Sequence, residues 1–161
     1  MAGRPLHARR SALSGLNSHH DNKDSMMSLE DKWAIQEMLA RFSYAWDAKD
    51  AEALAQLFSD DAVLEIFSSG GASPQLHLTS RAAIRAWAVQ NHTERLGGIQ
   101  TRHHQSGLLF EDLTSETART RTMVLVTRQG ATEAVPRLHR SGMYQMQWRK
   151  LPEGWRIVHL I

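Results

Sequence analysis

Residues 34–66 of the chain, AIQEMLARFSYAWDAKDAEALAQLFSDDAVLEI, contain two expected helices and the start of an expected sheet. In the first helix, apolar side chains recur at spacings of three and four residues, which is typical of a helix with one buried face. Ser28 marks its beginning as an N-cap residue, and Asp31 follows three positions later in a capping-box-like pairing. The apolar face consists of Ile35, Met38, Leu39, Phe42 and Trp46.

Asp47 closes this helix at the end where a carboxylate is least favoured, because the helix dipole is already negative there. A second short helix, AEALAQLF, is expected after Asp50; it ends at residues 59–61, and AVLEIF is expected to form a strand. Asp47 lies on the flank of the apolar face. Either it is an exposed turn residue, or a cationic group elsewhere in the fold requires a carboxylate at this position.

The second half of the chain has a different character. A third helix is expected over residues 81–96, with Ser80 as its cap and Gly97 at its end. Four segments rich in Val, Thr, Leu and aromatic residues follow, joined by short turns: residues 100–113, 116–128, 137–150 and 155–161. Helices followed by long antiparallel strands predict an α+β fold, with the helices packed on one face of a curved sheet.

Composition narrows the classes of function. The absence of cysteine excludes disulfides, thiolate nucleophiles and zinc–thiolate sites. No apolar stretch reaches the roughly 18 residues of a membrane span. The formal net charge of +2 comes from residues 1–25, where four basic side chains exceed two acidic ones, so the folded part is not expected to bind nucleic acid. We expect residues 1–27 to be a disordered tail and residues 28–161 to form one domain.

The histidines suggest one candidate site. His103 and His104 are consecutive in an expected strand, so their side chains point to opposite faces and cannot chelate one metal ion. An inward histidine beside a helix-terminal aspartate would form the base and orienter of general base catalysis. A hydrogen-bonded structural histidine is the alternative. His77 and His92 are expected to be exposed.

The stretch quoted above resembles the opening of SnoaL-like domains in the nuclear transport factor 2-like superfamily. The shared features are an Ile-Gln-Glu helix start, an aspartate closing that helix, a short Asp-x-x-Ala-Leu helix and Asp-Asp-Ala before a strand. TRHHQSGLLFED resembles the family's His-x-x-x-Asn strand, and YQMQWRKLPEGWRIVHL resembles its final hairpin. The resemblance covers residues 28–161 and implies a cone-shaped, curved mixed sheet that encloses an apolar pocket with three N-terminal helices.

The resemblance also implies an activity. The members most like this chain are scytalone dehydratase, hexachlorocyclohexane dehydrochlorinase and bile-acid dehydratase, in which a helix-end aspartate pairs with a strand histidine. Carried over by position, these two residues are Asp47 and His103. The implied protein is a small lyase or isomerase, of dehydratase, dehydrohalogenase or isomerase type. It removes a proton from an apolar and, we expect, cyclic substrate, and it needs no metal or organic cofactor.

Two positions depart from the family pattern. Gly107 stands where the asparagine is expected, and Phe42 stands where some dehydratases have a tyrosine. The group that polarises the substrate must therefore come from elsewhere, and Tyr144, Arg140 and Tyr44 are the candidates. The residues expected to line the substrate pocket are Phe42, Tyr44, Leu64, Ile66, Trp87 and Tyr144.

Other classes of function remain open at this point. The chain could be a non-catalytic family member that binds a ligand or serves as an oligomerisation module, because fold alone does not decide function. It could also be the small subunit of a ring-hydroxylating oxygenase, which requires a large partner subunit. We expect a cytoplasmic homo-oligomer, dimer or trimer, that associates through the outer sheet face, and no nucleic-acid or membrane partner. That face is expected to present Met143, Trp148 and Trp155.

Overall fold

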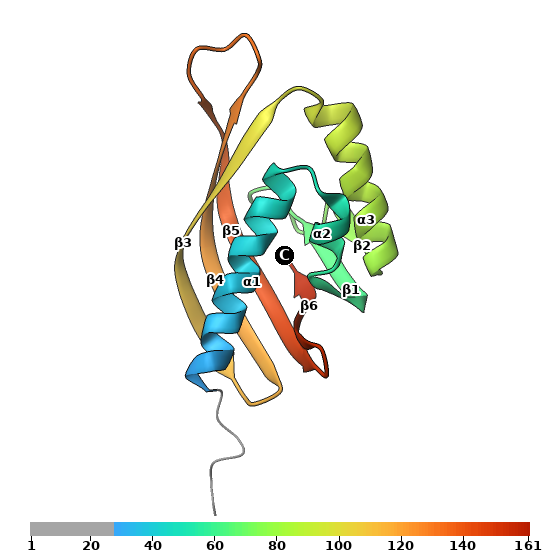
Figure 1. Cartoon of the computed structure of the whole chain (residues 1–161), viewed down its shortest axis with the longest axis vertical. Coiled ribbons are helices and arrows are strands. Elements are labelled where there is room, and N and C mark those ends of the chain that lie inside the picture. Colours follow the sequence, from blue (N-terminus) through green and yellow to red (C-terminus); the bar gives the residue numbers. More distant parts are fainter. Residues whose placement is uncertain (1–27) are drawn as a thin grey trace, which may run out of the picture.

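The computed structural model describes residues 28–161, so the expected tail lies outside the described part (Figure 1). The helical elements come first: α1 (Leu29–Asp47), α2 (Ala51–Ala55), α3 (Arg81–Gln90) and a π-helical turn, η1 (Asn91–Leu96). The strands are β1 (Phe58–Ile66), β2 (Leu76–Leu78), β3 (Gln100–Leu113), β4 (Thr117–Gln129), β5 (Arg137–Leu151) and β6 (Gly154–Leu160). No helix within this range is long and apolar enough to span a membrane.

The strands form one curved, unclosed sheet in the order β2-β1-β6-β5-β4-β3. β1 and β6 pair in parallel, and the other neighbours pair antiparallel. Figure 1 shows α1 crossing in front of β3, β4 and β5, with α2 and α3 beside it. The α+β fold expected from the order of elements is confirmed. β3 lies at one edge of the sheet, directly against α1, and this contact builds the candidate site.

The start of α1 is held by a buried carboxylate. Asp31 completes the predicted capping box with Ser28, whose hydroxyl oxygen accepts from the Asp31 amide at 3.1 Å. The Asp31 carboxylate also accepts from the Trp155 indole at 2.8 Å and pairs with the Lys150 ammonium group at 2.7 Å. Burial opposes ionisation, but the hydrogen bonds from Lys150, Trp155 and Ser28 outweigh it and lower the pKa of Asp31.

The apolar face of α1 packs into the core largely as its spacing predicts. Ile35, Leu39 and Phe42 are buried, and Met38 and Trp46 pack against the core while partly exposed. The rest of the core comes from the helices and the inner face of the sheet, including Leu54, Phe58, Ile84, Met146 and Ile157.

Two tryptophans expected on the outer face are in the core instead. Trp148 and Trp155 are 1% and 3% exposed. Side chains alternate along a strand, so Trp148 shares the inner face with Met146 and cannot share the outer face with Met143, which is 45% exposed. The Trp148 indole donates to the Thr120 hydroxyl at 2.9 Å inside the protein, which satisfies its polar group.

Element boundaries differ from the prediction in three places. α2 ends at Ala55, and residues 59–61 belong to β1. They form a strand because this segment pairs in parallel with β6, where the Ile157 amide donates to the Leu57 carbonyl at 2.9 Å. β2 was not predicted. The end of the third helix, residues 91–96, is a π-helical turn. Such turns are rare in proteins, and those that occur are often found at functional sites.

Replacing Asp31 with alanine should lower the free energy of unfolding by about 2 kcal/mol, because the buried Trp155 indole loses its acceptor. Urea denaturation followed by tryptophan fluorescence measures this. The matched control is Glu37→Ala, which removes an ion pair to Arg41 between side chains that are 63% and 65% exposed. That change should cost less than about 0.5 kcal/mol. Equal losses in the two variants would contradict the role given to Asp31.

Candidate active site

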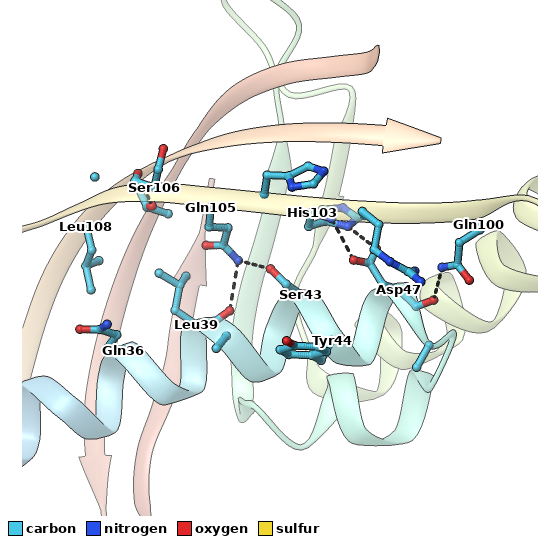
Figure 2. A pocket seen from close by; sticks show the side chains of 16 residues that line it. Gln36, Leu39, Ser43, Tyr44, Asp47, Gln100, His103, Gln105, Ser106 and Leu108 are labelled. Carbon is cyan, nitrogen blue, oxygen red and sulfur yellow. Dashed lines mark hydrogen bonds and ion pairs between the residues drawn. The ribbon is translucent and has the colours of Figure 1, made fainter. Parts of the chain in front are cut away.

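The carboxylate of Asp47 is held by the edge strand β3 (Figure 2). Its Oδ1 atom accepts from the Thr101 hydroxyl at 2.8 Å and lies 2.6 Å from Nδ1 of His103. Its Oδ2 atom accepts from the backbone amide of His103 at 2.8 Å. The side chain of Asp47 is only 10% exposed and that of His103 only 8%. Asp47 is therefore a buried, multiply hydrogen-bonded carboxylate rather than an exposed turn residue.

These contacts explain how a carboxylate is tolerated at the C-terminus of α1. The Gln100 side-chain amide donates to the Asp47 backbone carbonyl at 3.0 Å, which satisfies one of the open acceptors at this helix end. Burial opposes the ionised form, but the hydrogen bonds from the His103 ring, the His103 amide and the Thr101 hydroxyl outweigh it, so the pKa of Asp47 is lowered. The carboxylate is therefore ionised at neutral pH.

An ionised Asp47 fixes the ring of His103. Because the carboxylate can only accept, Nδ1 of the imidazole donates this hydrogen bond, which in the neutral ring leaves Nε2 as an acceptor. Within residues 28–161 no hydrogen bond is formed to Nε2, and the ring of Trp46 lies edge-on, with its centroid 6.1 Å from that of His103. His104 points to the other side of β3, where its Nε2 lies 3.1 Å from the Thr127 hydroxyl, as strand alternation predicts.

A groove of about 900 Å³ runs between α1 and β3 and reaches both members of this pair. Its walls are more polar than the apolar pocket that was expected: Gln36, Ser43, Tyr44, Gln100, Arg102, His104, Gln105, Ser106 and Thr122 all contribute. Tyr44, a predicted binding residue, lines the groove and is 78% exposed.

The other predicted binding residues lie on the inner side of α1 and do not line this groove. Phe42 and Leu64 are buried in the core. Ile66 and Trp87 are partly buried and pack against it. Tyr144 also packs there, and its ring meets that of Phe42 edge-on at 5.5 Å between centroids. These apolar side chains thus contribute to the core and not to the groove.

Several polar residues of the site were not predicted. Thr101 and Gln100 hold Asp47, as described above. The Gln105 side-chain amide donates to the Leu39 carbonyl at 3.1 Å and to the Ser43 hydroxyl at 2.5 Å, which ties α1 to β3. Strand alternation alone could have grouped positions 101, 103 and 105 on one face of β3.

The departure at Gly107 has a structural cause. This residue has a left-handed φ of +66° at an irregularity in the pairing of β3 with β4. A Cβ atom at this position would lie 2.8 Å from the Met123 side chain. An asparagine therefore could not replace Gly107 without displacing Met123, so the family's amide is not available here.

His92 was expected to be exposed, but it is buried, with 5% exposure. It packs edge-on against Trp46, with ring centroids 4.9 Å apart, and both of its ring nitrogens are buried without a hydrogen-bond partner among residues 28–161. Burial lowers the pKa of His92 and outweighs the backbone of Lys49, which raises it; of the nearby charges, that of Lys49 lowers the pKa and that of Asp50 raises it. Its spacing of four residues from the buried Ala88, itself four from Ile84, was the signal that could have revealed it.

No group of three or more His, Asp or Glu side chains in the described part of the chain is arranged to hold a metal ion. The chemical features of the site are therefore one oriented imidazole with a free nitrogen, one ionised carboxylate and a partly polar groove.

Residues 27–161 match the SnoaL-like domain family. The chain belongs to this family. The family match covers every residue that the structure describes, so the resemblance seen in the sequence is confirmed. Among curated proteins, no significant match to the chain was found.

Solved structures support the same fold. A nuclear transport factor 2-like protein with a cystatin-like fold from Novosphingobium aromaticivorans is 28% identical, with a TM-score of 0.69 over 82% of this chain and 80% of that one. A candidate scytalone dehydratase from the same species is 24% identical, with a TM-score of 0.67 and 82% of each chain covered. The β subunit of a candidate aromatic-ring-hydroxylating dioxygenase, also from that species, is 14% identical, with a TM-score of 0.69 over 80% and 84%. At these identities the last two show the fold alone.

The buried His92 should make stability depend on pH. Its folded pKa is lowered, so its contribution is fully present above the unfolded pKa of about 6.5 and is lost as pH falls through the folded value, because the unfolded chain binds the proton more readily. Replacing His92 with leucine or asparagine should therefore reduce the fall in melting temperature between pH 7.5 and 5. Curves parallel to that of the unmodified protein in both variants would contradict this assignment.

Proposed function

We propose that this SnoaL-like domain is a small lyase or isomerase in which His103 is the general base and Asp47 its orienter. The observation that supports this best is the 2.6 Å contact between Asp47 Oδ1 and His103 Nδ1, together with a free Nε2. A carboxylate–imidazole pair of this kind holds the correct tautomer and stabilises the imidazolium that forms when Nε2 takes a proton.

In the proposed reaction, Nε2 of His103 removes a proton from a carbon next to an activating or leaving group. The electron pair of the broken C–H bond forms a double bond, either as the leaving group departs or as an enol that is reprotonated elsewhere. The proton on Nε2 then passes to the leaving group or back to carbon. The charge of Asp47 offsets the imidazolium throughout, and no step requires a further reactant.

The substrate also needs a group that stabilises the negative charge formed on it. Burial raises the pKa of Tyr144, and the charge of Asp47 raises it further against the opposing charge of Arg140, so its phenol stays protonated and can donate. Tyr144 lies on the inner face beside Phe42. Because Tyr144 does not line the groove, we assign the phenol of Tyr44, which does, as the donor to the substrate, and Tyr144 as a core residue.

Replacing Asp47 with asparagine should preserve the fold and lower kcat by about 10⁴, as the comparable change does in serine proteases. His103→Ala should cost a similar factor, and the double variant little more, because the two residues act as one unit. The assay is a pooled screen of cyclic ketones, alcohols and halides. The matched control is Asp50→Asn, three residues away, where asparagine can replace the aspartate that caps α2.

Activity that survives in either single variant would remove the pair from the mechanism. A protein that binds pool members but turns none of them over would instead be a ligand-binding module, which is the alternative function.

We also propose a homo-oligomer, dimer or trimer, formed through the outer face of the sheet. Met123 and Met143 are cross-strand neighbours on that face and are 59% and 45% exposed. Leu109 and Leu125 extend the apolar surface, at 52% and 41% exposure. Several exposed apolar side chains on one sheet face are consistent with a protein interface.

Sedimentation velocity at micromolar concentration should show a dimer or trimer, and Leu125→Glu should produce monomers, because it places a charge within the apolar surface. Val135→Glu is the matched control, since Val135 is 66% exposed in the turn between β4 and β5. A monomeric unmodified protein would contradict the proposal.

A further inference from the structure

The pairing of β3, β4 and β5 places an arginine on the same face of the sheet as His103. His103 pairs with Val126 of β4, and Val126 pairs with Arg140 of β5, so the three residues form one row across the sheet. Val126 is 3% exposed and the His103 side chain 8%, which places this part of the row on the inner face, while Arg140 at the end of the row is exposed to solvent. At about 4.8 Å between neighbouring strands, the Cα atoms of Arg140 and His103 are roughly 10 Å apart, which an arginine side chain can span.

The next row contains a second arginine. Thr101, which holds Asp47, pairs with Arg128, and Arg128 pairs with Arg137. Arg137 forms an ion pair with Glu133. Arg128 is half-buried. Two arginines facing each other on neighbouring strands are unfavourable unless their charges are compensated.

His139 shows that these charges lie close together. It lies at an irregularity in the pairing of β5 with β4, and its Nε2 is 3.4 Å from the guanidinium of Arg140. Partial burial lowers the pKa of His139, and the charges of Arg140, Arg128 and His103 lower it further. Arg128, His139 and Arg140 therefore form a positive cluster that extends from the start of β5 toward His103.

The positive charge of this cluster is not fully balanced. Within the described residues, neither Arg128 nor Arg140 forms an ion pair, whereas arginines on the outer face do: Arg119 with Asp112, Arg121 with Glu111 and Arg149 with Asp61. The Asp47 carboxylate is already paired with His103, so it forms no ion pair with either guanidinium.

We infer that Arg140, supported by Arg128, forms a subsite for a carboxylate carried by the substrate. This inference rests on the proposed function of His103. The guanidinium of Arg140, which has no carboxylate partner among the described residues, matches an anionic group, and a planar guanidinium binds a carboxylate through two parallel hydrogen bonds. A carboxylate bound in this way orients the substrate so that its reacting C–H bond faces the imidazole of His103. The substrate class becomes a cyclic carboxylic acid.

The test uses benzoate, with benzamide as its neutral isostere, and measures binding to the full chain by calorimetry and by the shift of the His103 ring proton resonances. Benzoate should bind at least ten times more tightly than benzamide. Arg140→Gln should weaken benzoate binding at least ten-fold, and Arg128→Gln should weaken it less. Arg119→Gln, on the outer face, is the matched control and should leave binding unchanged. Higher ionic strength should weaken benzoate binding alone.

Equal affinity for benzoate and benzamide, absence of benzoate binding, or full binding in Arg140→Gln would overturn the inference. Inorganic phosphate that binds as tightly as benzoate, with the same dependence on Arg140, would make this a general anion site and overturn the assignment to a carboxylate. Because binding requires no turnover, Asp47→Asn should retain it. If Asp47→Asn loses activity and the unmodified protein does not bind benzoate, the proposed function stands and only the carboxylate subsite is refuted. If benzoate binds through Arg140 but Asp47→Asn keeps full activity, the subsite stands and the proposed function is refuted.

Discussion

The arrangement of the whole site depends on the contact between one carboxylate and one edge strand. Asp47 ends α1 where a negative charge is unfavourable, and it is buried as well. Three donors from two residues of β3 compensate both penalties: the Thr101 hydroxyl, the His103 amide and the His103 ring. Because two of these donors belong to the same residue, the strand cannot shift relative to the helix without losing the orientation of the imidazole.

The other end of α1 follows the same principle. Asp31 is also a buried carboxylate, and it binds α1 to β5 and β6 through Lys150 and Trp155. A helix of 19 residues is therefore fixed to the sheet at both ends, over a length of about 28 Å. Between these points, apolar packing on one side and the Gln105 contacts on the other hold it in place. The groove beside the pair thus has one rigid wall on each side.

Much of this fold is predictable from the sequence, because α1 and the four long strands have clear periodicity and boundaries. The pairing of Asp47 with His103 is different: the residues are far apart in the chain, and only the family resemblance connected them. Strand alternation could have placed Trp148 on the inner face with Met146, but the prediction put it on the outer face. The extent of β1 could not be found locally, because its pairing with β6 joins segments from opposite ends of the domain. The positive cluster around Arg140 needs the register of three strands, which no single segment contains.

The position of β3 at the edge of the sheet has one further consequence, for solubility. An edge strand presents unpaired backbone amides that can join a strand of another molecule. The amide of His103 is one of these, and the Asp47 carboxylate occupies it, so an incoming strand would have to displace a buried charge to pair there. The residue that orients the histidine therefore also blocks intermolecular sheet extension.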